Sequence, residues 1–106
     1  MQALQATATS TNYTGGLEYR SHVQAIGWQG WTDSSTYTGT VGRGLQMEAV
    51  QIRLTGELAE HYSIRYSTHV QGIGWQGWVS DGQTAGTTGR GLRVEAIKIE
   101  LVPKAP

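Results

Sequence analysis

The 106-residue chain has no cysteine, no phenylalanine and only two prolines. Without cysteine, a disulfide framework and a thiolate zinc site are excluded. Basic and acidic residues number eight each, so the formal net charge is zero at pH 7. That balance argues against nucleic-acid binding, which normally shows a basic excess. The longest apolar runs span a few residues, whereas a membrane-spanning helix needs roughly 20.

Three residue types are instead abundant for a chain of this length, with 15 glycines, four tryptophans and five tyrosines.

The first residues, MQALQATATST, have neither a basic start nor an apolar stretch, so they do not form a signal peptide. If the protein is secreted, we expect its leader to be absent from this sequence. The length allows one small domain.

A tandem repeat organises the chain. Residues 17–54 align with residues 64–101 at a constant offset of 47 without a gap, and 20 of the 38 pairs are identical. Seven consecutive positions, 32–38 against 79–85, all differ, whereas the flanking motifs HVQ, IGWQGW and GRGL are retained. We therefore predict a leader at 1–16, repeat 1 at 17–54, a joint at 55–63, repeat 2 at 64–101 and a tail at 102–106.

Apolar residues alternate with polar ones in each repeat, which predicts β-strands. In residues 64–71, Ile64, Tyr66, Thr68 and Val70 share one face, and residues 17–24 follow the same pattern. The alternation changes phase at Glu48-Ala49 and at Glu95-Ala96, as a β-bulge would produce. We find no helical periodicity.

We predict an all-β fold in which two tandem 47-residue repeats form a pseudo-two-fold sandwich or barrel of six to eight strands. A β-trefoil-like arrangement is the alternative. It needs three units, so two repeats would require a third repeat or a partner chain. Self-association into a homo-oligomer would also suit so small a domain.

The retained positions resemble the clostridial hydrophobic W (ChW) repeat. The resemblance rests on the pattern Y-x-x-H-V-Q-x-I-G-W-Q-x-W, followed after a short loop by G-T-x-G-x-G-L-x-x-E-A, which both copies carry. It implies a tandem module of secreted or cell-surface bacterial proteins that binds polysaccharide or other proteins. It implies no catalytic residue. The sequence departs from the family at Val50 and at the loop that begins with Asp33.

The GWQGW motifs are the first candidate for a binding site, because an indole ring stacks on the apolar face of a sugar or on a protein partner. We expect Trp28 and Trp75, which follow Ile-Gly, to lie in the core. Trp31 and Trp78 adjoin the variable loop, so we assign them to the ligand site, with core packing as the alternative.

Polar side chains near these tryptophans form the rest of the predicted site. His22 and His69 lie on the polar face of the first strand, and Gln29 and Gln76 lie within GWQGW, so they would hydrogen-bond a ligand. For the histidines, a cross-strand bond to the backbone is the alternative. Arg43 and Arg90 could bind an acidic group, or could pair with Glu48 and Glu95 across the bulge.

The sequence does not support catalysis. Asp33 and Asp81 are out of register between the repeats, and no second carboxylate recurs to form a glycosidase pair. Each copy retains one histidine without an adjacent acidic residue, so neither a metal nor a cofactor is predicted. We therefore expect a non-catalytic extracellular or cell-surface module that binds polysaccharide. The alternative is a structural or protein-interaction module whose partner is a cell-surface protein.

Overall fold

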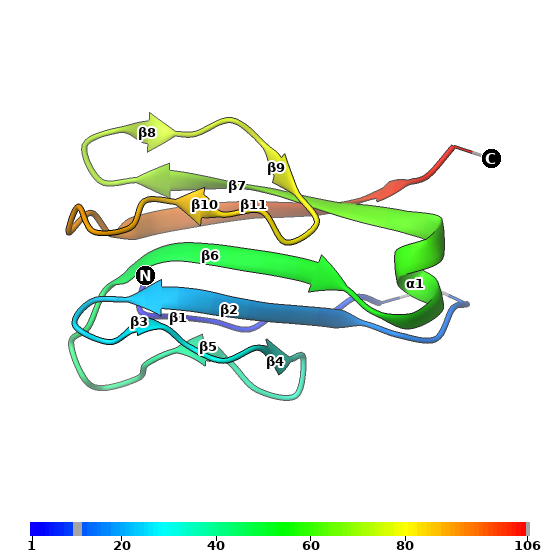
Figure 1. Cartoon of the computed structure of the whole chain (residues 1–106), viewed down its shortest axis with the longest axis horizontal. Coiled ribbons are helices and arrows are strands. Elements are labelled where there is room, and N and C mark those ends of the chain that lie inside the picture. The colour runs from blue at the N-terminus through cyan, green and yellow to red at the C-terminus, as the bar shows by residue number, and fades with distance from the viewer. Residues whose placement is uncertain (10–11, 106) are drawn as a thin grey trace.

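The computed structural model describes residues 1–9 and 12–105. These residues form 11 strands and one helix, so the predicted all-β class is confirmed (Figure 1). The helix, α1 (Gly56–His61), lies in the predicted joint and connects the repeats. Six residues are too few to show helical periodicity, which is why the sequence did not reveal it. Residues 10 and 11 of the predicted leader and Pro106 of the tail lie outside the described residues.

Each repeat is built on a long antiparallel ribbon. In repeat 1, β2 (Leu17–Val23) pairs with β6 (Met47–Leu54), and in repeat 2, β7 (Tyr62–Val70) pairs with β11 (Val94–Pro103). The remaining strands have two residues each: β1 (Ala3–Leu4), β3 (Gly27–Trp28), β4 (Thr32–Asp33), β5 (Thr38–Gly39), β8 (Gly74–Trp75), β9 (Val79–Ser80) and β10 (Ala85–Gly86).

The sheets cross the boundary between the repeats. One has the order β10-β6-β2-β3, so the short strand β10 of repeat 2 pairs with the last strand of repeat 1. Another has the order β11-β7-β8, and β1 pairs with β5. The described sheets form no closed barrel, so the barrel, one of the two predicted forms, is excluded. The pseudo-two-fold relation between the repeats stays a prediction. The first residues of the predicted leader pair with β5 and pack against the buried cluster of the core.

The two predicted β-bulges are confirmed. In repeat 1, His22 pairs with Ala49 and Val23 with Met47, so Glu48 is the extra residue. In repeat 2, the register shifts in the same way at Glu95, between Val94 and Ala96. A bulge bends its strand and redirects a side chain.

The core lies between the ribbons and contains tyrosine and aliphatic side chains in place of tryptophan. The alternation in β2 buries Leu17, Tyr19, Ser21 and Val23, as predicted. The buried cluster that joins the two repeats consists of Leu17, Tyr19, Met47, Val50, Ile52, Ile64, Tyr66 and Ala85. Because chain segments from both repeats supply this cluster, each repeat depends on the other for burial of its apolar face.

The hydroxyl of Tyr66 ties three segments together inside this core. It accepts a hydrogen bond from the Ile52 backbone N–H at 3.0 Å and donates one to the Gln83 carbonyl oxygen. Tyr19 makes the corresponding contacts in repeat 1, accepting from Ala6 N–H at 3.2 Å and donating to the Thr36 carbonyl at 2.7 Å. Burial raises the pKa of the Tyr66 phenol above its ordinary value of 10.0.

We predict that stability falls as the pH rises above about 10. The raised pKa means that the folded state holds the phenol proton more tightly than the unfolded state, so unfolding is favoured once the unfolded chain ionises. Tyr66→Phe should remove this part of the pH dependence. It should also lower the free energy of unfolding at neutral pH by about 1–3 kcal/mol, because the buried Ile52 N–H loses its partner.

Urea unfolding at pH 7 and pH 10.5 measures both effects. Tyr19→Phe is the matched control and should cost less at pH 7, because Ala6 is only half-buried and water can replace the hydroxyl. An unchanged pH dependence in Tyr66→Phe would contradict the assignment.

Candidate functional site

All four tryptophans lie on the outward face of their repeat. His22 pairs with Trp28 across β2 and β3, and His69 pairs with Trp75 across β7 and β8. Directly paired residues point to the same side of a sheet, so these indoles share the polar face with the histidines. Trp28 is half-buried and Trp75 is 45% exposed, so the expected core position of both is wrong. Of the pair assigned to the site, Trp31 is half-buried and Trp78 is 42% exposed.

We define a tryptophan face in each repeat by the indoles and the cationic or histidine side chains that contact them. The face of repeat 1 consists of His22, Arg20, Trp28, Trp31 and Arg53, and that of repeat 2 consists of His69, Arg65, Trp75, Trp78 and Lys98.

In repeat 1, arginine side chains cover the indoles. The guanidinium carbon of Arg20 lies 5.0 Å from the ring centroids of both Trp28 and Trp31, and that of Arg53 lies 3.8 Å from Trp31. Arg20 is held there by a hydrogen bond from Nε to Gln51 Oε1 at 2.7 Å. Cations over an aromatic face are attracted by the ring quadrupole, so these contacts fix the orientation of the rings.

In repeat 2, each indole has one cation, and the pair is more open. Lys98 Nζ lies 4.1 Å from the centroid of Trp75, and the guanidinium carbon of Arg65 lies 4.4 Å from that of Trp78. The residue that corresponds to Arg20 is Ser67, which is buried and donates to the Gln76 carbonyl oxygen at 2.7 Å. The bridging guanidinium of repeat 1 is thus replaced by a small side chain.

An exchange of charges keeps an arginine on the second tryptophan of each face. Glu18 and Arg53 pair across β2 and β6, with Arg53 Nη2 2.8 Å from Glu18 Oε1. At the corresponding positions of repeat 2, Arg65 pairs with Glu100 in the reverse orientation. The arginine moves from one strand to the other and still stacks on the corresponding indole. A search for identical positions in the two repeats missed these residues, because both positions differ. The exchange of Glu and Arg between the two positions is nevertheless visible in the sequence.

The bulge glutamates bind the predicted histidines. His22 Nδ1 lies 2.9 Å from Glu48 Oε1, and His69 Nδ1 lies 3.1 Å from Glu95 Oε1. Each imidazole also meets its tryptophan edge-on, at centroid distances of 5.5 Å in repeat 1 and 5.4 Å in repeat 2. The cross-strand partner is therefore a carboxylate, not the backbone. The bulge supplies it by turning the glutamate to the histidine side. A ligand role for the histidines stays a prediction.

The predicted glutamines bind the short strands of their own repeats. Gln29 Oε1 accepts from the Gly39 backbone N–H at 2.7 Å, and Gln76 Oε1 accepts from that of Gly86 at 2.8 Å. These bonds hold β5 and β10 beside GWQGW. Because the amide oxygens are already occupied, a role in ligand binding stays a prediction for these residues.

The arginines of the Gly-Arg-Gly turns are exposed. The described residues include no ion pair of Arg43 with Glu48 or of Arg90 with Glu95, so that alternative is wrong. The bulge turns both glutamates to other partners, because Glu48 binds His22 and Glu95 binds His69 and Arg93. Neither guanidinium stacks on a tryptophan in the described part of the chain. The expected binding of an acidic group by Arg43 and Arg90 stays a prediction.

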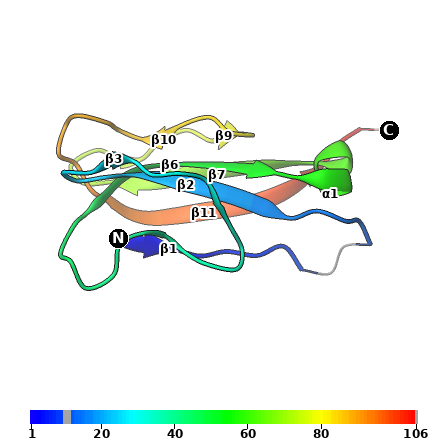
Figure 2. The same ribbon diagram turned by 60° about the horizontal axis from the view of Figure 1, so that its bottom comes forward.

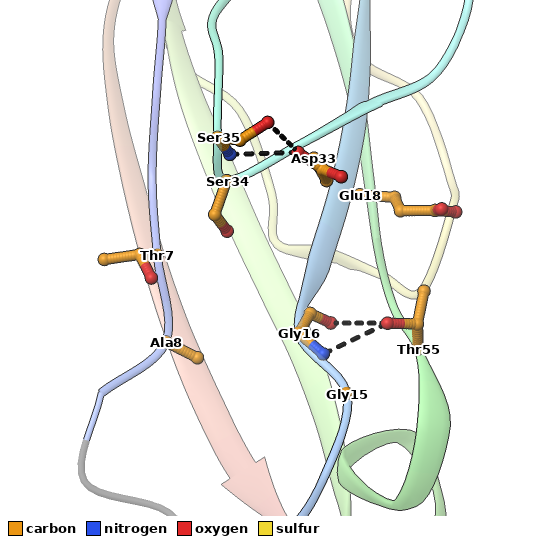
Figure 3. A pocket seen from close by; sticks show the side chains of 9 residues that line it. All are labelled: Thr7, Ala8, Gly15, Gly16, Glu18, Asp33, Ser34, Ser35 and Thr55. Atoms are coloured by element: carbon orange, nitrogen blue, oxygen red, sulfur yellow. Dashed lines mark hydrogen bonds between the residues drawn. The ribbon is translucent and has the colours of Figure 1, made fainter.

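The variable loop of repeat 1 borders a hollow of about 460 Å³ that no tryptophan lines (Figure 3). Several of its polar groups are bound within the protein. Asp33 Oδ1 accepts from the Ser35 hydroxyl and N–H, which lowers the pKa of Asp33, and Thr55 Oγ1 accepts from Gly16 N–H at 3.0 Å. The tryptophan faces are instead open surfaces.

The described residues contain no group of three or more histidine, aspartate and glutamate side chains placed to hold a metal ion. Within the same residues, no helix is long and apolar enough to cross a membrane.

The fold and the two faces define a tandem all-β repeat module with an outward aromatic and cationic surface on each repeat. The clostridial hydrophobic W (ChW) family matches the chain twice, at residues 22–56 and 69–103. The chain belongs to this family, and the resemblance noted in the sequence is confirmed. No curated protein and no solved structure matches the chain.

We predict that the two orientations of the Arg–Glu pair are interchangeable. Glu18→Arg or Arg53→Glu alone should lower the free energy of unfolding by about 0.5–1 kcal/mol, since each places like charges in contact on the surface. The double variant carries the arrangement of repeat 2 and should recover most of the loss. A double-mutant cycle by urea unfolding measures the coupling, and additive effects would show that the pair does not matter.

Proposed function

We propose that this chain is a non-catalytic polysaccharide-binding module of a secreted or cell-surface protein, with one binding surface on each tryptophan face. The observation that carries the proposal is the exposed indole pair of repeat 2. Trp75 and Trp78 remain 45% and 42% exposed although a folded chain gains by burying such rings. Each ring is oriented by a cation, so the stacking surface exists before a ligand binds.

The groups around the indoles suit a ligand that is both apolar and hydroxylated. A sugar ring offers a C–H face to an indole, while its hydroxyls need hydrogen-bond donors and acceptors at the edge. On repeat 2 the donors are the Lys98 ammonium and the Arg65 guanidinium, and the carboxylates of Glu95 and Glu100, although paired within the protein, keep further lone pairs as acceptors. An open surface of this kind suits a polymer chain, which passes along the protein without being enclosed.

Two surfaces on one chain favour a repetitive ligand. When one surface is bound, the second meets the same polymer at a high effective concentration, so weak individual sites combine into firm attachment. The surfaces are unequal, because Arg20 lies over both indoles of repeat 1, whereas each indole of repeat 2 contacts one cation and is more exposed. We assign the stronger site to repeat 2.

The carboxylates support a binding role more than a catalytic one. Glu48, Glu95, Glu18 and Glu100 are all engaged with histidine or arginine side chains. A retaining or inverting glycosidase needs two carboxyl groups that face a common substrate bond. The paired carboxylates here instead hold the side chains of the tryptophan faces in place.

We predict that Trp75→Ala combined with Trp78→Ala weakens polysaccharide binding at least about tenfold, the loss of roughly 1.4 kcal/mol of stacking. The measurement is a titration with soluble bacterial and plant polysaccharides, followed by tryptophan fluorescence and calorimetry. Tyr37→Ala is the matched control, because Tyr37 is an aromatic residue of 45% exposure outside the tryptophan faces, and it should bind as the wild type does.

Binding of unchanged affinity in the folded double variant would contradict the assignment of the stronger site to repeat 2. No binding of any polysaccharide by the wild type would favour the alternative function, a protein-interaction module with the same faces as its contact surface.

A second prediction concerns the inequality of the faces. In the Trp75→Ala, Trp78→Ala background, only repeat 1 can bind. Arg20→Ser introduces the residue type found at the corresponding position of repeat 2 and should uncover Trp28 and Trp31. We expect tighter binding than in the background alone. Weaker binding would show that the Arg20 guanidinium itself contacts the ligand.

A further inference from the structure

The first nine residues correspond to the last strand of a repeat. Residues 1–9, MQALQATAT, align with residues 47–55, MEAVQIRLT, at an offset of 46, with identical residues at Met1, Ala3, Gln5 and Thr9. The structure places them accordingly. Ala3 and Leu4 pair with Gly39 and Thr38 in the same way that Ala49 and Val50 pair with Gly86 and Ala85.

The hydrogen bonds repeat this correspondence. Thr40 N–H donates to the Gln2 carbonyl at 2.9 Å, and Thr87 N–H donates to the Glu48 carbonyl at 3.0 Å. Ala6 N–H and Ile52 N–H donate to the hydroxyls of Tyr19 and Tyr66, respectively.

Two close approaches complete the match. A Cβ on Gly39 would lie 2.2 Å from the Gln2 carbonyl oxygen, and one on Gly86 would lie 2.4 Å from that of Glu48. The opening segment therefore takes the place that a preceding repeat's closing strand would take.

The three corresponding segments meet at their first residues. Met47 N–H donates to the Met1 carbonyl oxygen at 2.9 Å, and the Met1 amino group donates to the Val94 carbonyl oxygen at 2.8 Å. Met1, Met47 and Val94 are thus joined by two backbone bonds. The chain contains three closing strands but only two first strands, β2 and β7, among its described residues.

The third closing strand, β11, lacks the cover that β6 has. β6 lies between β2 and β10, whereas β11 pairs with β7 alone among the described strands. Ala49, Val50 and Ile52 are fully buried on β6. The corresponding Ala96, Ile97 and Ile99 on β11 are only half-buried.

A hollow of about 320 Å³ lies between the opening segment and β11, which run beside each other in Figure 2. More than half of its residues are apolar. Leu17 and Ile64 occupy corresponding positions in the first strands of the two repeats, and both line this hollow. The corresponding apolar residue of a third first strand would fit beside them. The full lining is Ala6, Thr7, Ala8, Thr9, Leu17, Ile64, Ile99, Glu100 and Leu101.

We propose that this groove and the free edge of β11 bind a further ChW repeat, whose first strand fills the groove and whose short strand pairs with β11. Residues 1–9 would then be the closing strand of that third repeat. The contact is the existing β6–β10 interface used again, with an alternating strand of the type Ile64-Arg-Tyr-Ser-Thr-His-Val70 as the occupant. An open strand edge next to half-buried aliphatic residues is a template for this pairing.

The test uses the whole chain, residues 1–106, extended by a second copy of residues 57–93. The added segment has a first strand and short strands but no closing strand, so it can fold only by using residues 1–9 and β11. We expect a monomer with a higher midpoint of thermal unfolding. The backbone N–H groups of residues 95–99 that point away from β7, along the free edge of β11, should exchange at least about tenfold more slowly than in the unextended chain.

An added segment that exchanges as an unfolded chain, with an unchanged midpoint, would overturn the proposal. Ala8→Arg should abolish the gain in the extended chain, measured relative to the unextended chain with the same substitution, because its side chain would occupy the groove. Ile73→Arg is the control at an exposed residue outside the groove and should preserve the gain. Equal gains in both variants would also contradict the proposal, since the groove would not be the binding place.

Discussion

The pairing of β10 with β6 is the contact on which the arrangement of the two repeats depends. It joins the short strand of repeat 2 to the closing strand of repeat 1, and it needs a residue without a side chain at Gly86, where φ is +98° and the Glu48 carbonyl is close. Gln76 holds Gly86 from the other side through its amide oxygen. Beside this pairing, the Ile52 N–H of β6 donates a hydrogen bond to the Tyr66 hydroxyl, which joins the two ribbons across the core.

The bulges connect this framework to the surface. Each adds one residue to a closing strand, and the extra residue, Glu48 or Glu95, turns to a histidine on the outward face. The histidine meets the first tryptophan of its repeat edge-on, while an arginine stacks on the second. Since tyrosine, methionine and aliphatic residues fill the core, the tryptophans are left for the surface. That placement supports the proposed binding role.

The repeats also show how a feature persists when its residues change. Glu18 and Arg53 become Arg65 and Glu100, yet an arginine lies on the second indole in both repeats. The pair Arg20 and Gln51 likewise becomes Ser67 and Lys98, but Lys98 lies over Trp75 alone whereas Arg20 lies over both indoles of its repeat, so the two faces become unequal. Comparing identical positions reveals the retained tryptophans and histidines. It does not reveal a pair whose members exchange strands, because the two positions are neighbours only in the folded ribbon.

The sequence by itself determined the all-β class, the two repeats, both bulges and the family, because strand periodicity and a tandem duplication are local patterns. It did not determine that Trp28 and Trp75 face outward. Their direction follows from pairing with His22 and His69, which brings together residues on different strands. The role of residues 1–9 was likewise decided in three dimensions. Their similarity to residues 47–55 is slight, and only the hydrogen bonds to β5 and Tyr19 show that they occupy the place of a closing strand.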